Sequence, residues 1–200
     1  MQGKPSVNTE DVLAIFEARG ALKRGHFVLS SGLHSDTYLD KSVVSTFPDA
    51  TERLCRALAE KARAELAGEP AFVVGPAMGA IIYGYETARQ MGLPFVFAER
   101  VDGEFRFRRY PLPQGAKVIV VEDIVSTGLS ARECIDAARK AGAEVLGLAC
   151  LIDRSNGKAD VGVPMTALAQ LDVQAWPGDA LPDHLAGTPA VKPGSRGVSQ

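Results

Sequence analysis

The sequence has 200 residues, of which 46% are hydrophobic, and it carries a net charge of −2 at pH 7. Because a domain typically holds about 150 residues, this length predicts one domain with a small additional subdomain and enough apolar side chains for a real core. The slightly acidic charge argues against a nucleic-acid or membrane-surface binder, and with neither a secretory leader nor an apolar stretch of roughly 20 residues we expect a cytoplasmic protein.

The first half of the chain alternates predicted helices with predicted strands. Pro48 suits the first turn of a helix, and Gly68 and Gly92 suit positions just after helix ends. Apolar strands that alternate with helices indicate an α/β fold, with a mainly parallel sheet covered on both faces. The expected elements are a helix after Thr9 to about Arg19, a helix over residues 48–67, a strand over 71–74, a turn over 75–79, a helix over 80–90 and a strand over 95–97.

Residues 95–110 depart from this alternation. The segment Val101-Asp-Gly-Glu104 is typical of a type I′ turn, so we expect an antiparallel hairpin that projects from the sheet. Phe105 and Phe107 share one face of its second strand. We expect the other face to carry a group of arginines, which are Arg106, Arg108, Arg109 and, across the turn, Arg100. Taken from these residues alone, the group is a solvated charged surface.

Residues 118–130 carry the most specific pattern of the chain. The β-branched run Val118–Val121 predicts a buried strand, and the residues from Ser130 onward predict an amphipathic helix closed by Gly142. The small, hydroxyl-rich loop between them therefore lies at a helix N-terminus. There, unpaired N–H groups and the helix dipole favour a phosphate dianion, and Gly128 lets the backbone approach closely.

Glu122 and Asp123 stand between that strand and the loop. They would repel a phosphate, so we expect them to accept hydrogen bonds from two ribose hydroxyls or to hold a metal beside them. A phosphate at one end and a sugar diol at the other predict a phosphoribosyl ligand. The alternative is an ordinary strand-to-helix turn with an acidic strand end, and a P-loop is excluded because the Gly-Lys-Ser/Thr ending is missing.

The rest of the chain continues the α/β pattern. Strands are expected over residues 144–152 and 166–171, and the first leads into Arg154 at the sheet edge where α/β proteins bind ligands. The planar fork of Arg154 suits a carboxylate or a ring carbonyl. The tail after Trp176 is expected to lie extended over the surface. Three scattered cysteines are expected to be reduced core thiols, and they are Cys55, Cys134 and Cys150.

Two segments resemble the type I phosphoribosyltransferases. Residues 118–130 resemble the phosphoribosyl-pyrophosphate signature of that family. The residues from Phe27 to Tyr38 resemble the Phe-x-Leu-x-Ser-Gly-x-x-Ser-x-x-Tyr segment of its orotate phosphoribosyltransferases, which other branches lack. The resemblance covers nearly the whole chain. It implies a type I phosphoribosyltransferase fold in one domain over residues 1–200, with a central mainly parallel sheet flanked by helices. A hood over residues 1–45 plus the tail and a core over residues 46–172 are implied as its parts. The resemblance also implies that the antiparallel hairpin is a flap that closes over the substrate and excludes water.

The resemblance also implies an activity, which is transfer of phosphoribosyl from 5-phosphoribosyl 1-diphosphate to orotate, giving orotidine 5′-monophosphate in pyrimidine biosynthesis. Mg²⁺ is the implied cofactor, with no residue assigned as its ligand, and a homodimer is the implied assembly. The residues with implied catalytic roles are Glu122, Asp123, Arg100 and Arg106. The residues implied to bind the phosphoribosyl diphosphate are Arg100, Glu122, Asp123, Ile124, Val125, Ser126, Thr127, Gly128, Leu129 and Ser130. Orotate is implied to bind Ser126 and Arg154.

Two other functions remain open, a purine-type phosphoribosyltransferase and a non-catalytic regulator that senses the phosphoribosyl diphosphate. The chain also departs from the better-known family pattern, which has lysines where Ser30 and Gly79 stand and a lysine- and histidine-rich flap in place of the arginine hairpin. Whether the hairpin arginines replace these groups is left open. His26 and His34 are expected to be hydrogen-bonding or surface residues rather than catalytic bases.

Overall fold

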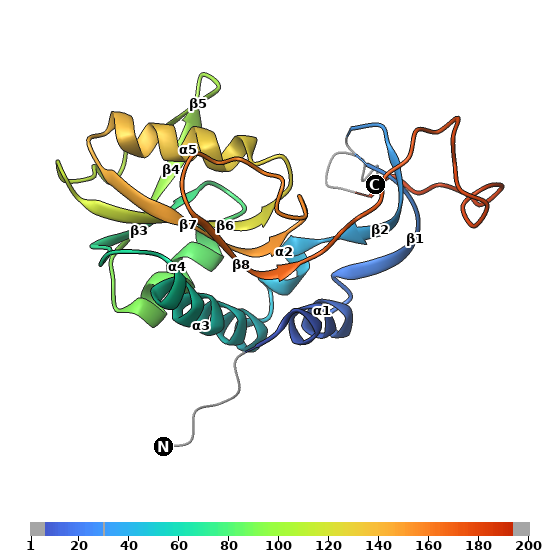
Figure 1. Cartoon of the computed structure of the whole chain (residues 1–200), viewed down its shortest axis with the longest axis horizontal. Coiled ribbons are helices and arrows are strands. Elements are labelled where there is room, and N and C mark those ends of the chain that lie inside the picture. The colour runs from blue at the N-terminus through green and yellow to red at the C-terminus, as the bar shows by residue number, and fades with distance from the viewer. Residues whose placement is uncertain (1–6, 30, 194–200) are drawn as a thin grey trace, which may run out of the picture.

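The computed structural model describes residues 7–29 and 31–193 (Figure 1), so Ser30 and the two ends of the chain lie outside it. Its helices are α1 (Thr9–Ala18), α2 (Lys41–Val44), α3 (Pro48–Glu65), α4 (Ile81–Met91) and α5 (Leu129–Lys140). Its strands are β1 (Leu22–Val28), β2 (His34–Leu39), β3 (Phe72–Pro76), β4 (Phe95–Val101), β5 (Glu104–Arg106), β6 (Lys117–Val125), β7 (Glu144–Asp153) and β8 (Met165–Gln170).

Six strands form the central sheet in the order β5-β4-β3-β6-β7-β8. Five of them run parallel, and β5 alone in this sheet is antiparallel to its neighbour β4. The chain moves outward from β3 to β4 and later returns to place β6 on the other side of β3. The strand order therefore reverses between β3 and β6, and the carboxyl ends of these two strands mark the switch point where α/β sheets bind ligands.

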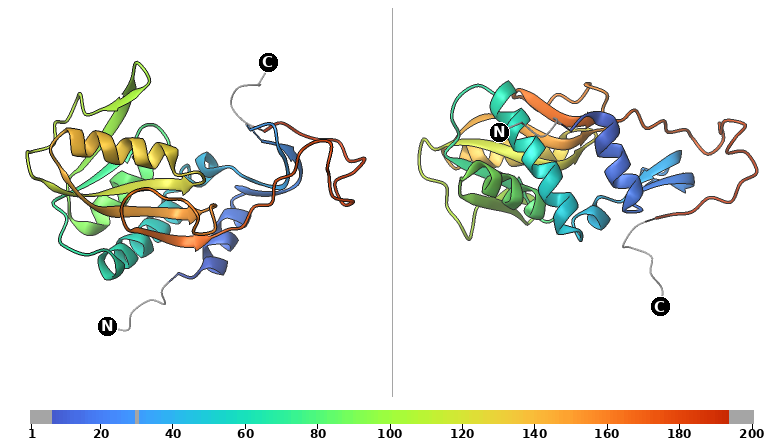
Figure 2. Two further views of the ribbon diagram at one scale, coloured as in Figure 1. Left: turned by 45° about the horizontal axis from the view of Figure 1, so that its top comes forward. Right: turned by 90° about the horizontal axis from the view of Figure 1, so that it is seen from below.

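Helices cover both faces of this sheet. Helices α1, α3 and α4 lie on one face and α5 lies on the other (Figure 1), and the view from below in Figure 2 shows α1, α3 and α4 in front of the sheet. The two covered faces explain why strand β6 is apolar at consecutive positions. Val118 and Val120 pack into the core under α5, whereas Ile119 and Val121 pack into the core under α3 and α4. A strand buried on both faces needs apolar side chains in both directions, as predicted.

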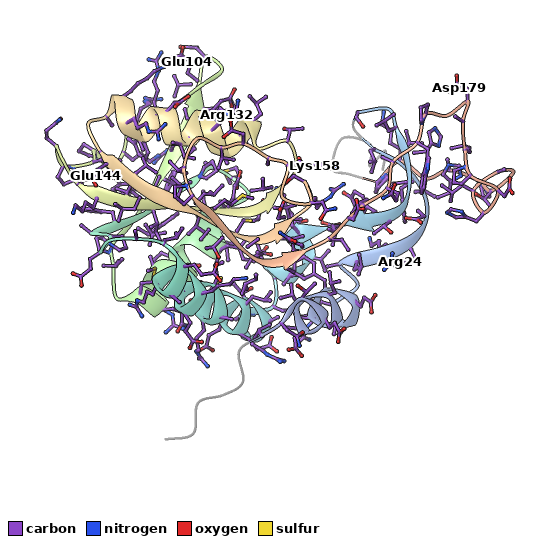
Figure 3. All side chains as sticks on the ribbon, in the orientation of Figure 1. Arg24, Glu104, Arg132, Glu144, Lys158 and Asp179 are labelled. Carbon is purple, nitrogen blue, oxygen red and sulfur yellow. The ribbon has the colours of Figure 1, made fainter. Side chains whose placement is uncertain are left out.

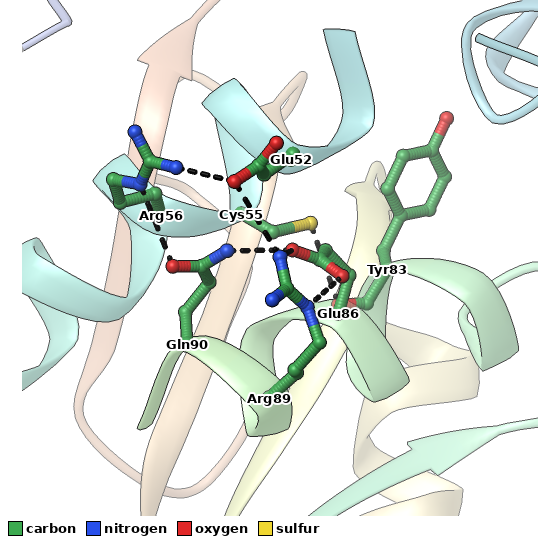
Figure 4. A network of polar contacts seen from close by, with 7 residues as sticks. All are labelled: Glu52, Cys55, Arg56, Tyr83, Glu86, Arg89 and Gln90. Carbon is green, nitrogen blue, oxygen red and sulfur yellow. Dashed lines mark hydrogen bonds and ion pairs between the residues drawn. The ribbon is translucent and has the colours of Figure 1, made fainter. Parts of the chain in front are cut away.

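A polar network joins the outer surfaces of α3 and α4 (Figure 4). Glu86 accepts two hydrogen bonds of 2.8 Å from Arg89 and one of 2.6 Å from Gln90, and these partners, Arg89 first, lower the pKa of Glu86. Arg89 also reaches Glu52 of α3 at 3.5 Å. The network links α4 to α3, and the turn after β3 leads directly into α4.

The strands β1 and β2 form a separate antiparallel pair beside the central sheet, and the C-terminal tail runs along it (Figure 1). Trp176 exchanges two backbone hydrogen bonds of 2.8 Å with His34, and Val191 pairs with β1. His26 Nε2 lies 2.6 Å from His34 Nδ1, and His26 Nδ1 lies 2.9 Å from the Thr188 hydroxyl. Both histidines are thus hydrogen-bonding residues, as expected, and they join the pair to the tail.

Several boundaries differ from the expected ones. Helix α1 is capped by Asn8, which accepts a 2.8 Å hydrogen bond from Asp11 N, so Thr9 lies inside the helix instead of preceding it. Strand β3 extends to Pro76, into the segment expected as a turn, and β5 ends at Arg106.

All three cysteines are buried free thiols, as expected, and burial raises their pKa values. Among the helices of the described segments, none is long and apolar enough to cross a membrane.

Candidate active site

The loop after β6 forms one wall of a cavity at the switch point. Gly128 has a φ of 77° and immediately precedes α5. A Cβ atom there would lie 2.8 Å from Val161 Cγ1, so only glycine fits both the left-handed backbone and the available space. The cavity has a volume of about 250 Å³ and is lined by Arg100, Glu122 and residues 124–131. The predicted phosphate-binding loop and Arg100 therefore face a common space beside the first turn of α5.

The position of Arg100 corrects one sequence expectation. In the β4–β5 register Arg100 lies opposite Phe105, and opposite residues of an antiparallel pair project from the same face. Its guanidinium carbon lies 4.2 Å from the centre of the Phe105 ring, and the group also forms an ion pair with Glu133 of α5. The prediction that Arg100 shares a face with Arg106 is wrong, because that prediction ignored strand register.

The other hairpin arginines make surface contacts. Arg106 lies on the opposite face from Arg100 and reaches Glu104 at 3.6 Å, at the hairpin tip labelled in Figure 3. Arg109 pairs with Glu99, and the side chain of Arg108 is exposed. The four arginines thus do not form one cluster, and Arg100 is the one among them that lines the loop cavity.

The two acids at the end of β6 are buried, and a lysine holds one of them. Glu122 is 7% exposed and Asp123 is 0% exposed. Lys41 Nζ lies 2.8 Å from Asp123 Oδ1 and 2.7 Å from Asp123 Oδ2. Burial first, and then the adjacent Asp123 carboxylate, raise the pKa of Glu122 to about 8, while the Lys41 ammonium acts in the opposite direction. The pair therefore combines an acid that resists ionisation with one that has a counterion.

Arg154 lies beside the same loop. Asp153 is in register with Val125, and Arg154 N donates to Val125 O at 2.7 Å, so Arg154 and Ser126 follow neighbouring strand ends. The buried Asp153 carboxylate fixes the next turn by accepting hydrogen bonds from Ser155 N at 2.7 Å and Gly157 N at 2.8 Å.

The Arg154 guanidinium has an unused donor. Burial lowers the pKa of Arg154, and its Nε is buried with no hydrogen-bond partner among the described residues. Burial and then the Asp40 charge raise the pKa of Tyr38, while the Arg154 charge acts in the opposite direction. A buried donor without a partner costs roughly 1–3 kcal/mol, which a ligand with an acceptor oxygen would recover.

Lys41 is the site residue that sequence reasoning missed. It lies three residues after the Phe27–Tyr38 segment, and Asp40 and Lys41 are the first charged residues that follow this segment. That position alone carried no signal for a contact with an acid 82 residues further along the chain.

Comparison with known proteins agrees with this geometry. The chain matches the phosphoribosyl transferase domain family over residues 45–179. It is 56% identical to an orotate phosphoribosyltransferase of Phenylobacterium zucineum and 57% identical to one of Maricaulis maris, in each case over 95% of this chain and 98% of the relative. The crystal structure of orotate phosphoribosyltransferase from Aeropyrum pernix has a TM-score of 0.66 and 27% identity, covering 80% of this chain and 93% of that one.

The parallel sheet with this loop at its switch point is thus the architecture of a phosphoribosyltransferase domain. The chain belongs to the orotate phosphoribosyltransferase family. The predicted family and the type I phosphoribosyltransferase fold, with its mainly parallel sheet, are confirmed.

Proposed function

We propose that the protein transfers the phosphoribosyl group of 5-phosphoribosyl 1-diphosphate to orotate, producing orotidine 5′-monophosphate and diphosphate for pyrimidine biosynthesis. The relatives named for this activity align over 95% of the chain. The geometric observation that carries the choice of base is Arg154, whose buried Nε has no partner among the described residues. Orotate has a carboxylate and ring carbonyls that would accept from such a donor.

The phosphoribosyl substrate would bind along the loop after β6. Its 5-phosphate would meet the N–H groups at the start of α5, beside the hydroxyls of Ser126, Thr127 and Ser130. Its ribose hydroxyls would donate to Glu122 and Asp123. Arg100, which lines the same cavity, would contribute positive charge beside the phosphates. Arg106 remains a candidate only if the hairpin moves, because it now lies on the other face.

The residues present fit a Mg²⁺ ion that is shared with the substrate. Within residues 7–29 and 31–193, no three His, Cys, Asp or Glu side chains gather into a metal site. Mg²⁺ commonly binds one or two carboxylates together with substrate phosphates, and Glu122 and Asp123 would be those carboxylates here. When bound, Mg²⁺ supplies positive charge that stabilises the departing diphosphate.

Catalysis would rest on positioning and electrostatics. The orotate ring nitrogen loses its proton and forms a bond to the anomeric carbon as the bond from that carbon to the diphosphate oxygen breaks, and the proton passes to the departing diphosphate or to water. Positive charge develops on the ribose and negative charge on the leaving group, so buried acids near the sugar and cations near the diphosphate both stabilise the transition state. A closed site would exclude water from the reactive carbon.

We also propose the larger organisation that goes with this activity. The hood would comprise residues 1–45 and the C-terminal tail, supported by the backbone pairing of Trp176 and Val191 with the β1–β2 pair, and the core would span residues 46–172. A cytoplasmic homodimer is the proposed form. Exposed apolar side chains, including Ile82, Tyr85 and Tyr110, line a cavity of about 550 Å³ on the α4 side, which is surface that a second copy would cover.

A base-specific assay tests the function. Purified protein is incubated with 5-phosphoribosyl 1-diphosphate and orotate, adenine, guanine or hypoxanthine, with and without Mg²⁺, and loss of each base is followed. Consumption of orotate alone, dependent on Mg²⁺, is the expected result. Consumption of a purine would favour a purine-type enzyme, and binding of the phosphoribosyl substrate without turnover of any base would favour a regulator.

A further inference from the structure

Lys41 has a contact that none of the roles above uses. Its ammonium lies between the two oxygens of Asp123, at 2.7 and 2.8 Å, and its side chain is 45% exposed whereas that of Asp123 is 1% exposed. Of the Lys and Arg residues that the structure describes, it alone forms an ion pair with either acid of the β6 pair. The lysine thus lies between the buried Asp123 carboxylate and the solvent.

The turn after β3 passes directly beside this ammonium. A Cβ atom built on Gly79 would lie 3.1 Å from Lys41 Nζ and 2.4 Å from Asp123 Oδ2. Any side chain at position 79 would therefore displace the ion pair. Gly79 leaves room for a positive charge that comes from another element, at the carboxyl end of β3 and next to the acids at the carboxyl end of β6.

A hydrogen bond from helix α4 holds the backbone of Lys41 in place. The buried hydroxyl of Tyr83 donates to the Lys41 carbonyl oxygen at 2.7 Å, and Tyr83 belongs to α4, which the polar network in Figure 4 joins to α3. Burial, followed by the Asp123 charge, raises the pKa of this phenol, which keeps it protonated as a donor. A fixed backbone with a half-exposed ammonium leaves the end of the side chain free to change partners.

We propose that Lys41, which holds Asp123 in the free protein, turns to the diphosphate of the phosphoribosyl substrate when the ribose hydroxyls reach Asp123. The proposal rests on the proposed function. The buried Asp123 carboxylate would repel the diphosphate, and a cation located between the acids and the Gly79 turn removes that repulsion. The ribose hydroxyls replace the ammonium as donors to Asp123, so that the lysine is released at the moment when the diphosphate arrives.

Calorimetric titration of inorganic pyrophosphate into protein saturated with ribose 5-phosphate, and of ribose 5-phosphate alone, both in metal-free buffer, tests this role. Lys41→Met is expected to weaken pyrophosphate binding at least about tenfold, the loss expected for one charge-assisted hydrogen bond. Ribose 5-phosphate affinity should change little, and Lys41→Arg should largely retain pyrophosphate binding. Lys117→Met is the matched control, because Lys117 is exposed at the opposite end of β6 and should leave both affinities unchanged.

A second comparison covers the case in which Lys41→Met does not fold because Asp123 loses its partner. The double variant with Lys41→Met and Asp123→Asn carries no unpaired charge, and its pyrophosphate affinity is compared with that of Asp123→Asn alone. The same loss of about tenfold is expected there.

The outcomes separate this proposal from the proposed function. Unchanged pyrophosphate affinity in the variants lacking Lys41, or a loss confined to ribose 5-phosphate, would show that the lysine serves Asp123 alone. If the unaltered protein converts orotate while either of those results holds, the lysine proposal fails by itself. If the unaltered protein neither binds pyrophosphate nor converts orotate, both proposals fail.

Discussion

Replacing Glu122 with glutamine is expected to make the protein more stable at high pH. The carboxyl group is 7% exposed, and burial raises its pKa from the ordinary value of 4.5 to about 8. Between these two values the folded protein holds a proton that the unfolded chain has already released. Stability from this group is therefore complete below pH 4.5 and is lost as the pH rises through 8. Glutamine is neutral throughout and avoids that loss.

The size of the effect follows from the same two values. The interval from 4.5 to about 8 corresponds to about 5 kcal/mol at 1.36 kcal/mol per pH unit. This figure is an upper bound for the effect of burial, because the Asp123 charge also contributes to the raised pKa of Glu122. We expect Glu122→Gln to exceed the parent by about 2 kcal/mol or more at pH 9. For a chain of this size that is a rise in Tm of roughly 4–8 °C.

Thermal unfolding followed by circular dichroism between pH 5 and pH 9 measures the difference. The stability gap between Glu122→Gln and the parent should widen as the pH rises and should nearly vanish at pH 5 and below. Glu60→Gln is the control, because Glu60 is exposed on α3 and its neutralisation should give no pH-dependent gap. Equal pH slopes for the parent and Glu122→Gln would refute the argument that burial opposes ionisation at this position.

Three further changes probe the site. Arg154→Ala should weaken orotate binding by about 2–5 kcal/mol, the range for truncating one partner of a buried charge pair, and should leave binding of the phosphoribosyl substrate nearly unchanged. Full orotate affinity of this variant in a titration would show that Arg154 does not belong to the site. Asp123→Asn keeps the side-chain shape and should lower both turnover and Mg²⁺-dependent binding of the phosphoribosyl substrate, whereas unchanged kinetics with a lower Tm would make the acid purely structural. At least one single Arg→Ala change in the hairpin, which we expect to be Arg100→Ala, should lower turnover about tenfold or more, equivalent to about 1.4 kcal/mol, with little effect on orotate affinity. If the four Ala variants at Arg100, Arg106, Arg108 and Arg109 all turn over like the parent, the hairpin is only a solvated surface.

Local sequence was sufficient to predict the strand, loop and helix that form the centre of the candidate site. The strand β6, the glycine loop and the start of α5 are consecutive in the chain, so the apolar run, the acids and the helix signals could be read together. The turn at Asp102 and Gly103 was predicted for the same reason, and their φ values of 51° and 86° agree with it. Features that depend on residues a few positions apart are determined by steric and hydrogen-bonding preferences that the sequence displays directly.

Only the tertiary structure decided which distant groups meet. The side-chain face of Arg100 depends on the register between β4 and β5, and the pairing of the tail with β1 and β2 joins segments at opposite ends of the chain. The contact of Lys41 with Asp123 requires that β2 end beside the switch point and that position 79 lack a side chain. No local preference encodes such contacts, because they result from how helices and strands pack once the sheet has formed. A lysine after a strand has the same local sequence whether its side chain faces water or a buried acid.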